Sequence, residues 1–478
     1  MKKIKIGLTG LMQINFIGDK QAMFDRAKKE MSELSERYGF ILEIYPDLIV
    51  TRNDAQKAAN ELKAKDVDMI MLHMSSFAAG EVVLPFAYTA LPLGLWATPE
   101  PNVDGVLAHN SFCGINMYSG IIAAYLTDYN IKYKWYYGWQ ENPMMAERLE
   151  LTVRALTAVI NLRSAKVAII GGIAPGFNDL YYDERKWQKK LGVNMQRNHE
   201  FGDIKAKMDS YTESDVAEFR KQVESDYAVI PEVVMKNITY NAKVLKAYAD
   251  TAREGNYEAL AVSCWPRLQT HFNGLACSTL GELCGMGIPA ACEGDLPAAI
   301  SMLILKYISG GEITALMDLV AFDENDNTVQ LWHCGPACKK LANKSGAVLE
   351  RLYEQEADGS VSRRNSINDM TFKPGDITVM RITGECDHTF LSTGTYGDNG
   401  KPGFTGSRGW LGELTLNTKP VNARDYINTI MTQGFQHHYP MVYGKYDGAL
   451  MEMNYWLGLK PVEKIEYTPY MTEGNIFI

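Results

Sequence analysis

The sequence lacks the marks of several protein classes. Its 57 Asp and Glu residues outnumber its 48 Lys and Arg residues, and no basic face offsets the net charge of -9, which argues against a nucleic-acid partner. The long uncharged run "VVLPFAYTALPLGLWATP" contains three prolines and is a poor membrane span. The opening "MKKIKIGLTG" has no apolar segment typical of a secretory signal. We therefore expect a protein that works away from membranes.

Cysteines are few for a chain of 478 residues. The eight cysteines do not have the spacing of a disulfide framework, which predicts reduced thiols and a cytoplasmic protein. Cys334 and Cys338 in "HCGPAC" raise a zinc alternative, but no second Cys/His pair stands at finger spacing, so we do not expect a structural zinc site. The composition, 46% hydrophobic and 22% charged, is that of an ordinary globular protein.

Strand and helix patterns alternate through the first two thirds of the chain. "KKIKIGLTG" has the pattern of a strand ending at a glycine, a helical pattern runs from Lys20 to Tyr38, and the rhythm restarts at "KVAIIGGIAPG". Strands that alternate with helices predict parallel α/β domains. We expect an N-terminal α/β domain over 1–163 and a second α/β domain over 164–310.

The character of the chain changes after Gly310–Gly311. "DITVMRITGE", "GWLGELTLN" and "FQHHYPMVYG" predict strands, so we expect a β-rich C-terminal domain over 311–478. The loop "IIGGIAPG" lacks both the full dinucleotide fingerprint and a Walker lysine. A plain strand-to-helix turn is the favoured interpretation of that loop, and nucleotide binding is the alternative.

Acids and histidines stand at predicted strand ends in the last two domains. Glu293 follows the strand "IPAAC", Asp318 follows "EITALM", and one apolar helix joins the two strands. If these strands are parallel, both carboxylates lie at one edge of a sheet. His333 ends the strand of "QLWHCG". The pair His437–His438 begins or lies within "HHYPMVYG", where neighbouring side chains should point to opposite faces, so that only one faces a site.

Each of these residues alone has a plainer interpretation. Glu293 could cap the helix that follows it, Asp318 could lie in a solvated acidic turn, and a single histidine is usually structural. Taken together, these residues favour a functional site over separate structural roles. Two strand-end carboxylates and a strand histidine make an O, O, N ligand set that suits Mn²⁺, Mg²⁺ or a related divalent cation.

The segment "ACEGD…MLILKYISGG…ALMDL" resembles the core of the L-fucose isomerase/L-arabinose isomerase superfamily of aldose–ketose isomerases. "SCWPRLQ", "LWHCG" and "HHYPMVYG" extend the resemblance to its short, fucose-isomerase-like branch, over most of the chain. The resemblance implies two α/β domains, a β-rich third domain, a Mn²⁺ ion in each active centre, and assembly as homotrimers or homohexamers. It also implies a small-molecule sugar as the substrate.

The resemblance also implies roles for individual residues. Glu293 and Asp318 match the metal-binding, catalytic acids, and His438 matches the metal-binding histidine. Trp265 falls where the family places a substrate-contacting side chain, and Gln13 matches a glutamine that reaches into a neighbouring subunit's site. His333 lies near a metal histidine of the arabinose branch only, so both metal binding and substrate binding stay open for it.

The departures from the family pattern concern the substrate. Ser75 or Ser76 stands where the fucose branch has an aromatic residue, and the chain is shorter than well-known fucose isomerases. We expect an aldohexose, 6-deoxy or 6-substituted, L-fucose-like or sulfoquinovose-like. Arg267 and Arg408 could meet an anionic group, although a structural role is the plainer interpretation of each.

The expected chemistry is isomerisation through a cis-enediol by two general acid–base groups. Two alternatives stay open: a catalytically silent sugar-binding paralogue, and a metal-dependent sugar epimerase or lyase on the same scaffold.

Overall fold

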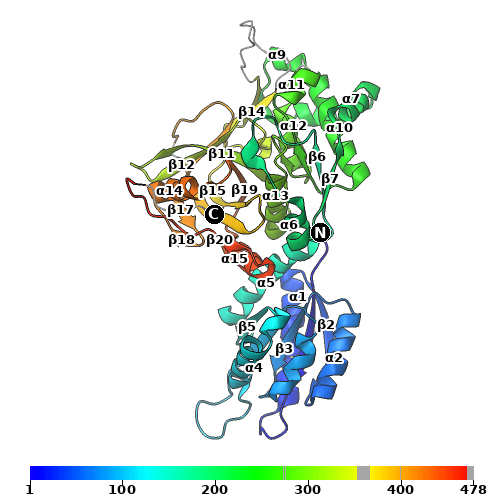
Figure 1. The fold of residues 1–478 in the computed structure, drawn as a ribbon, viewed down its shortest axis with the longest axis vertical. Coiled ribbons are helices and arrows are strands. Elements are labelled where there is room, and N and C mark those ends of the chain that lie inside the picture. The colour runs from blue at the N-terminus through cyan, green and yellow to red at the C-terminus, as the bar shows by residue number, and fades with distance from the viewer. Residues whose placement is uncertain (273, 275, 352–365, 399, 471–478) are drawn as a thin grey trace. The chain divides into compact units, whose positions relative to one another are not determined.

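The computed structural model describes residues 1–272, 274, 276–351, 366–398 and 400–470. Contacts divide the chain into two compact units, Met1–Ile160 and Asn161–Ile478 (Figure 1). Among the described residues, no helix combines the length and apolar character needed to cross a bilayer.

The first unit is built on a parallel sheet with the strand order β2-β1-β3-β4-β5. Its central strand β3 is buried along its whole length, as expected for a parallel sheet covered on both faces. Helix α2 begins at a capping box in which Thr51 and Asp54 satisfy each other's backbone amides. The elements of the unit are β1 (Lys5–Leu11), α1 (Lys20–Tyr38), β2 (Ile41–Ile49), α2 (Arg52–Ala64), β3 (Met69–Met74), α3 (Val83–Ala87), β4 (Leu93–Ala97), α4 (Ser111–Tyr125) and β5 (Tyr133–Tyr137). Helix α5 (Pro143–Leu162) leads out of it.

The second unit contains a smaller parallel sheet with the order β10-β9-β6-β7. Its strands are β6 (Lys166–Ile170), β7 (Asn194–His199), β9 (Ala259–Val262) and β10 (Ala290–Ala291). The helices of this part of the chain are α6 (Glu184–Leu191), α7 (Phe201–Ser210), α8 (Ala217–Glu224), α9 (Glu232–Met235), α10 (Ile238–Gly255), α11 (Arg267–Phe272) and α12 (Cys277–Gly285).

The rest of the second unit is β-rich and contains a closed barrel. Strands β16, β15, β19, β11, β12 and β17 pair in that order, each antiparallel to the next, and a β16–β17 pairing closes the ring. Their bounds are β11 (Thr314–Asp323), β12 (Thr328–His333), β15 (Gly375–Ile382), β16 (His388–Tyr396), β17 (Ser407–Leu416) and β19 (His438–Tyr443). Outside the ring lie β8 (Tyr227–Val229), β13 (Ala347–Glu350), β14 (Ile367–Thr371), β18 (Lys419–Pro420), β20 (Lys460–Pro461), α14 (Ala423–Gln433) and α15 (Asp447–Leu457). The predicted fold class, parallel α/β followed by a β-rich region, is confirmed.

Helix α13 (Leu296–Ser309) joins the two sheets of the second unit. It is buried over nearly its whole length and contacts strands of both the small sheet and the barrel. Asp295 caps its first turn, and Gly310 ends it in the left-handed conformation that glycine adopts without strain. One prediction is wrong here: β10 and β11 do not share a parallel sheet, because β11 enters the barrel between two antiparallel neighbours. The helix carries the chain from one sheet to another.

Candidate active site

Glu293 lies in a tight turn at the carboxyl end of β10. Its φ is +60°, a left-handed conformation that is uncommon for a residue with a side chain and that clusters at functional sites. Backbone hydrogen bonds fix the turn on both sides, from Ala174 N to Glu293 O (2.9 Å) and from Gly294 N to Val262 O (2.9 Å). A Cβ on Gly294 would lie 2.0 Å from the carbonyl oxygen of Gly172. The loop "IIGGIAPG" therefore packs against the turn that holds Glu293.

The barrel supplies the second carboxylate and two histidines. Asp318 lies within β11 and pairs in register with His438 of β19. The Asp318 carboxylate has one oxygen 3.6 Å from His438 Nε2 and the other 4.0 Å from Nδ1 of His333, which ends β12 as predicted. The backbone amide of Cys334 lies 2.8 Å from that same Nδ1. Three neighbouring antiparallel strands thus deliver these side chains to one place.

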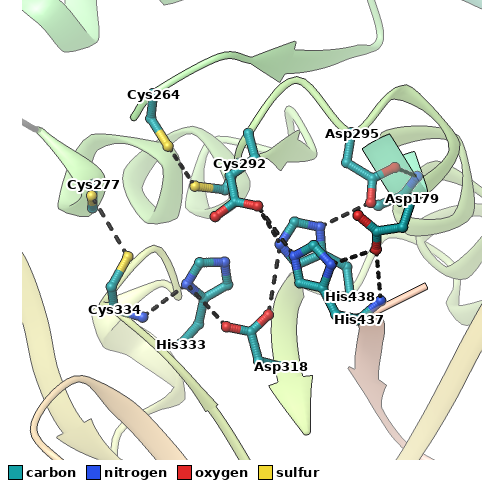
Figure 2. Close-up of polar contacts among 12 residues, drawn as sticks. Asp179, Cys264, Cys277, Cys292, Asp295, Asp318, His333, Cys334, His437 and His438 are labelled. Carbon is teal, nitrogen blue, oxygen red and sulfur yellow. Dashed lines mark hydrogen bonds and ion pairs between the residues drawn. The ribbon is translucent and has the colours of Figure 1, made fainter. Parts of the chain in front are cut away.

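Both adjacent histidines reach Glu293. The Glu293 Oε2 atom lies 3.2 Å from His437 Nε2 and 3.5 Å from His438 Nε2. The two ring centres are 4.2 Å apart, and Figure 2 shows the two rings side by side. The prediction that the pair points to opposite faces is wrong. Strand β19 begins only at His438, so the alternation of a strand does not apply to the residue before it.

A further carboxylate stands behind each histidine. Asp295 accepts a hydrogen bond from His438 Nδ1 at 2.9 Å, and Asp179 contacts His437 Nδ1 at 2.7 Å. Arg381 of β15 donates to Asp295 at 2.7 Å and to the backbone carbonyl of His438 at 3.2 Å. These contacts orient both rings with Nε2 toward Glu293. A carboxylate behind a ligating histidine is the arrangement that fixes its tautomer in metal sites.

The two supporting pairs differ in burial. The side chains of Asp295, Arg381 and His438 are fully buried, whereas Asp179 and His437 keep 44% and 37% of their side-chain surface exposed. Burial opposes a charge on Asp295, but the guanidinium of Arg381 and the His438 ring outweigh it and hold the pKa of that carboxyl well below its usual range. Asp295 therefore stays ionised.

The His437 ring lies between two acids. Burial disfavours its charged form, but the hydrogen bonds to Asp179 and Glu293 outweigh burial and raise the pKa of His437 to about 10. The carboxylates of the cluster thus favour a positive charge among them.

Several buried ligand atoms of the cluster have no hydrogen-bond partner among the described residues: Asp318 Oδ1, His333 Nε2 and His438 Nε2. Buried polar atoms are rarely left unpaired without a functional reason. Two groups bring their ligand atoms within 4.8 Å of one another, Glu293 with His437 and His438, and Asp318 with His333 and His438. Carboxylate oxygens and imidazole nitrogens suit a divalent cation such as Mn²⁺, so the residues fit the predicted metal.

Trp265 and Arg267, two of the predicted substrate contacts, are linked to the cluster through other residues. Trp265 is 42% exposed, and its ring packs edge-on to Phe177, whose ring centre is 5.7 Å from that of His437. Trp265 is thus linked to the cluster through one aromatic ring. Arg267 donates to the carbonyl of Gly171 in the loop beneath Glu293.

Two other predicted residues have structural contacts of their own. Gln13 belongs to the first unit, where its backbone amide donates to Ser76 Oγ at 2.9 Å. Arg408 is paired with Asp369 and donates to Gly406 O at 2.8 Å, a structural arrangement.

Sequence reasoning missed Asp179, Asp295 and Arg381. Asp295 is the last letter of "CEGD", a position typical of a helix cap, which does not distinguish it from a structural residue. Arg381 is the one charge inside the apolar run "ITVMRI", and a lone charge inside a strand pattern is a signal for a buried ion pair. Asp179, in the loop "PGFNDL", left no pattern that distinguishes it from a turn residue.

Comparison with known proteins finds sulfoquinovose isomerases. The protein of that name from Priestia aryabhattai is 27% identical over 427 residues, which cover 87% of this chain and 90% of that protein. Those from Alkalicoccus urumqiensis and Clostridium sp. (strain MSTE9) are 27% and 26% identical over 84% and 76% of this chain and 86% and 78% of their own lengths. No family model matches. Among solved structures, an ABC transporter solute-binding protein from Agrobacterium vitis reaches a TM-score of 0.19 at 10% identity over 64% of this chain and 90% of its own, too low to carry an argument.

These relatives support the isomerase activity predicted from the sequence, and with it an enzyme. They do not confirm the resemblance to the fucose/arabinose isomerase superfamily. Metal dependence, mechanism and assembly stay predictions.

Proposed function

We propose that the chain is a divalent-metal-dependent aldose–ketose isomerase that acts on sulfoquinovose, an aldohexose with a sulfonate at C6, through a cis-enediol. We infer the substrate from the sulfoquinovose isomerases, because their alignment with this chain covers most of both sequences. The observation that carries the chemistry is that Glu293 and Asp318 both approach His438 Nε2, at 3.5 Å and 3.6 Å. Asp318 Oδ1 and His438 Nε2 are buried there without a hydrogen-bond partner among the described residues.

Each residue of the cluster has a role in the proposal. Glu293, Asp318 and His438 hold the metal, and His333 contributes either to the metal or to the substrate. When bound, Mn²⁺ or another divalent cation would stabilise the negative charge that develops on the sugar oxygens. His438 keeps Nε2 directed at the cluster because Asp295 accepts from its Nδ1.

The two acids also move protons. Isomerisation removes a proton from C2 and returns one to C1, with exchange of the hydroxyl protons, and two positioned carboxylates can do this in turn. Glu293 is held by backbone bonds on both sides of its turn and contacts His437, which steadies its carboxylate. Trp265, Arg267 and Gln13 are the proposed substrate contacts, with Gln13 provided by a neighbouring subunit.

The test is product analysis by NMR in D₂O with purified protein and sulfoquinovose, before and after EDTA and with Mn²⁺ added back. We expect the ketose, with deuterium incorporated, in the metal-loaded sample only. Full turnover after metal removal contradicts the metal assignment. A C2 epimer or an elimination product identifies an epimerase or a lyase, and sugar binding without turnover identifies a silent paralogue. L-Fucose serves as the control aldose without a sulfonate.

We further propose a cytoplasmic homotrimer or homohexamer in which Gln13 completes the site of a neighbour. Sedimentation should show the oligomer, and mixing a Gln13→Ala protein with an inactive Glu293→Gln protein should restore part of the activity. A fully active monomer contradicts this assembly.

A further inference from the structure

Four cysteine sulfurs lie beside the histidine cluster, and the proposed reaction uses none of them. The Sγ atoms of Cys264 and Cys292 are 2.7 Å apart, and those of Cys277 and Cys334 are 3.8 Å apart (Figure 2). The eight cysteines of the chain all lie in its described part, and all are reduced thiols. Thiols this close together near a reaction centre call for a chemical explanation.

The first pair is placed by the small parallel sheet. Cys264 follows β9 by two residues and Cys292 follows β10 directly, and these strands are neighbours with Ala261 opposite Ala291. The hydrogen bond from Gly294 N to Val262 O joins the ends of the two strands near the thiols. The sulfur–sulfur distance exceeds a disulfide bond of about 2.05 Å by only about 0.7 Å. Forming that bond requires little movement of the backbone.

A thiolate metal site explains the four sulfurs less well. In the described part of the chain, the groups of three or more side chains that bring ligand atoms within 4.8 Å contain only acids and histidines. A Cys₄ zinc site needs all four sulfurs around one point. The sulfurs instead follow one another in a row, Cys264–Cys292–Cys334–Cys277, in which Cys292 also contacts Cys334. The 2.7 Å contact between Cys264 and Cys292 is the one suited to thiol–disulfide chemistry.

We propose that Cys264 and Cys292 are a reversible oxidation site that responds to hydrogen peroxide. One sulfur attacks the peroxide, breaks its O–O bond and becomes a sulfenic acid, with release of one water. The second sulfur then displaces the sulfenic oxygen as a second water and forms the S–S bond. The two thiols lose two electrons and two protons in all, and both oxygens of the peroxide leave as water. A dithiol reductant reverses the step.

The position of Cys292 connects this oxidation to the active site. It directly precedes Glu293, whose turn is fixed by backbone bonds on both sides. Drawing Cys292 toward Cys264 therefore displaces the carboxylate that contacts both histidines. Misplacement of a catalytic group by about 1 Å can lower a rate by about 10²-fold. The cross-link does not depend on the proposed function; only its effect on turnover does.

The test treats the purified full-length enzyme with a small excess of hydrogen peroxide, followed by catalase, denaturing alkylation and peptide mass mapping. We expect a peptide that joins Cys264 to Cys292 with the loss of two hydrogens. Turnover of sulfoquinovose should fall at least about tenfold, as expected for a partly displaced carboxylate, and dithiothreitol should restore it. Mn²⁺ affinity, measured by calorimetry on the same samples, should fall with it.

Three variants give the matched controls. Cys264→Ser and Cys292→Ser should each be unable to form the cross-link and should keep their turnover after peroxide. Cys386→Ser removes a buried thiol outside the four sulfurs and should respond like the unaltered enzyme. Absence of the joined peptide overturns the oxidation site. A complete cross-link with unchanged turnover overturns its effect on the enzyme. If the proposed function fails, no turnover is seen before oxidation, while the joined peptide still forms.

Discussion

The carboxyl ends of the strands carry different side chains in the two parallel sheets. We call them the first edge, in the unit Met1–Ile160, and the second edge, in the unit Asn161–Ile478. In the first unit, the residues after β1 and β3 are neutral: the Gln13 amide donates to Ser76 Oγ, and Ser75 Oγ lies 2.9 Å from Nδ1 of His73. In the second unit, the corresponding edge carries Glu293, and the thiols of Cys264 and Cys292 lie beside it.

The difference shows that a parallel sheet alone does not make this site. Its edge supplies tight turns and a carboxylate, but His333, His438 and Asp318 come from antiparallel barrel strands. The second edge has such a barrel packed nearby through helix α13, which contacts both sheets. Acids and histidines gather there, and the buried Arg381 compensates part of the negative charge.

The largest expected effect is on stability, at Arg381. Removing one partner of a buried ion pair leaves the other charge unpaired, which typically costs about 3–5 kcal/mol. Arg381→Met should lower the free energy of unfolding by about that amount, measured by urea titration.

Arg424→Met provides the matched control, because Arg424 pairs with Glu324 at the surface and both side chains are about half exposed. We expect little change in its unfolding midpoint. Equal losses in the two variants would mean that the second edge does not depend on its buried arginine.

The next effect concerns the proton-moving acids. An amide keeps a ligating oxygen but cannot accept a proton at neutral pH, so Glu293→Gln and Asp318→Asn should each lose at least about 10² in kcat at full metal occupancy. The double variant should lose less than the product of the two single losses, because both groups act on one intermediate. The measurement is kcat with metal content determined on the same samples.

Recovery of near-normal kcat in excess Mn²⁺ would leave both acids as ligands only.

Much of this edge was predictable from the sequence. Strand and turn patterns placed Glu293 after β10 and His333 at the end of β12, and both lie there. The prediction that two strands of one parallel sheet bring Glu293 and Asp318 together is wrong. An apolar strand pattern does not reveal whether the strand joins a parallel sheet or a barrel. That choice depends on partners distant in sequence.

The supporting residues were harder to predict for the same reason. Asp179 contacts a histidine 258 residues away, and Arg381 contacts Asp295 across 86 residues. No local periodicity encodes such pairs. The contact of His437 with Glu293 also depends on where β19 begins, and strand boundaries are poorly determined by sequence patterns.

A smaller effect distinguishes the two histidines. His438 belongs to both potential ligand groups and is fully buried, whereas His437 belongs to one and is partly exposed. His438→Ala should weaken Mn²⁺ binding at least about tenfold more than His437→Ala, since even residues behind a ligand typically change metal affinity by 10–100-fold. Calorimetric titration of the metal-free variants measures this. Equal losses, or a greater loss at His437, would reassign the ligand.

The smallest effect is expected at the first edge. Ser76 Oγ accepts from the Gln13 amide, and replacing it with alanine leaves that amide without its partner. Ser76→Ala should lower the free energy of unfolding by about 1 kcal/mol, the net value of one hydrogen bond, and leave Mn²⁺ affinity unchanged. Ser119→Ala, which removes a surface hydroxyl that bonds within helix α4, is the control and should change stability less.

Urea titration, calorimetry and kcat on the same preparations separate the possible outcomes. A fall in kcat at unchanged metal occupancy and oligomeric state would mean that the neutral edge also serves a reaction centre. The contrast between the two edges would then describe two halves of one site in an assembly, as the proposal for Gln13 requires.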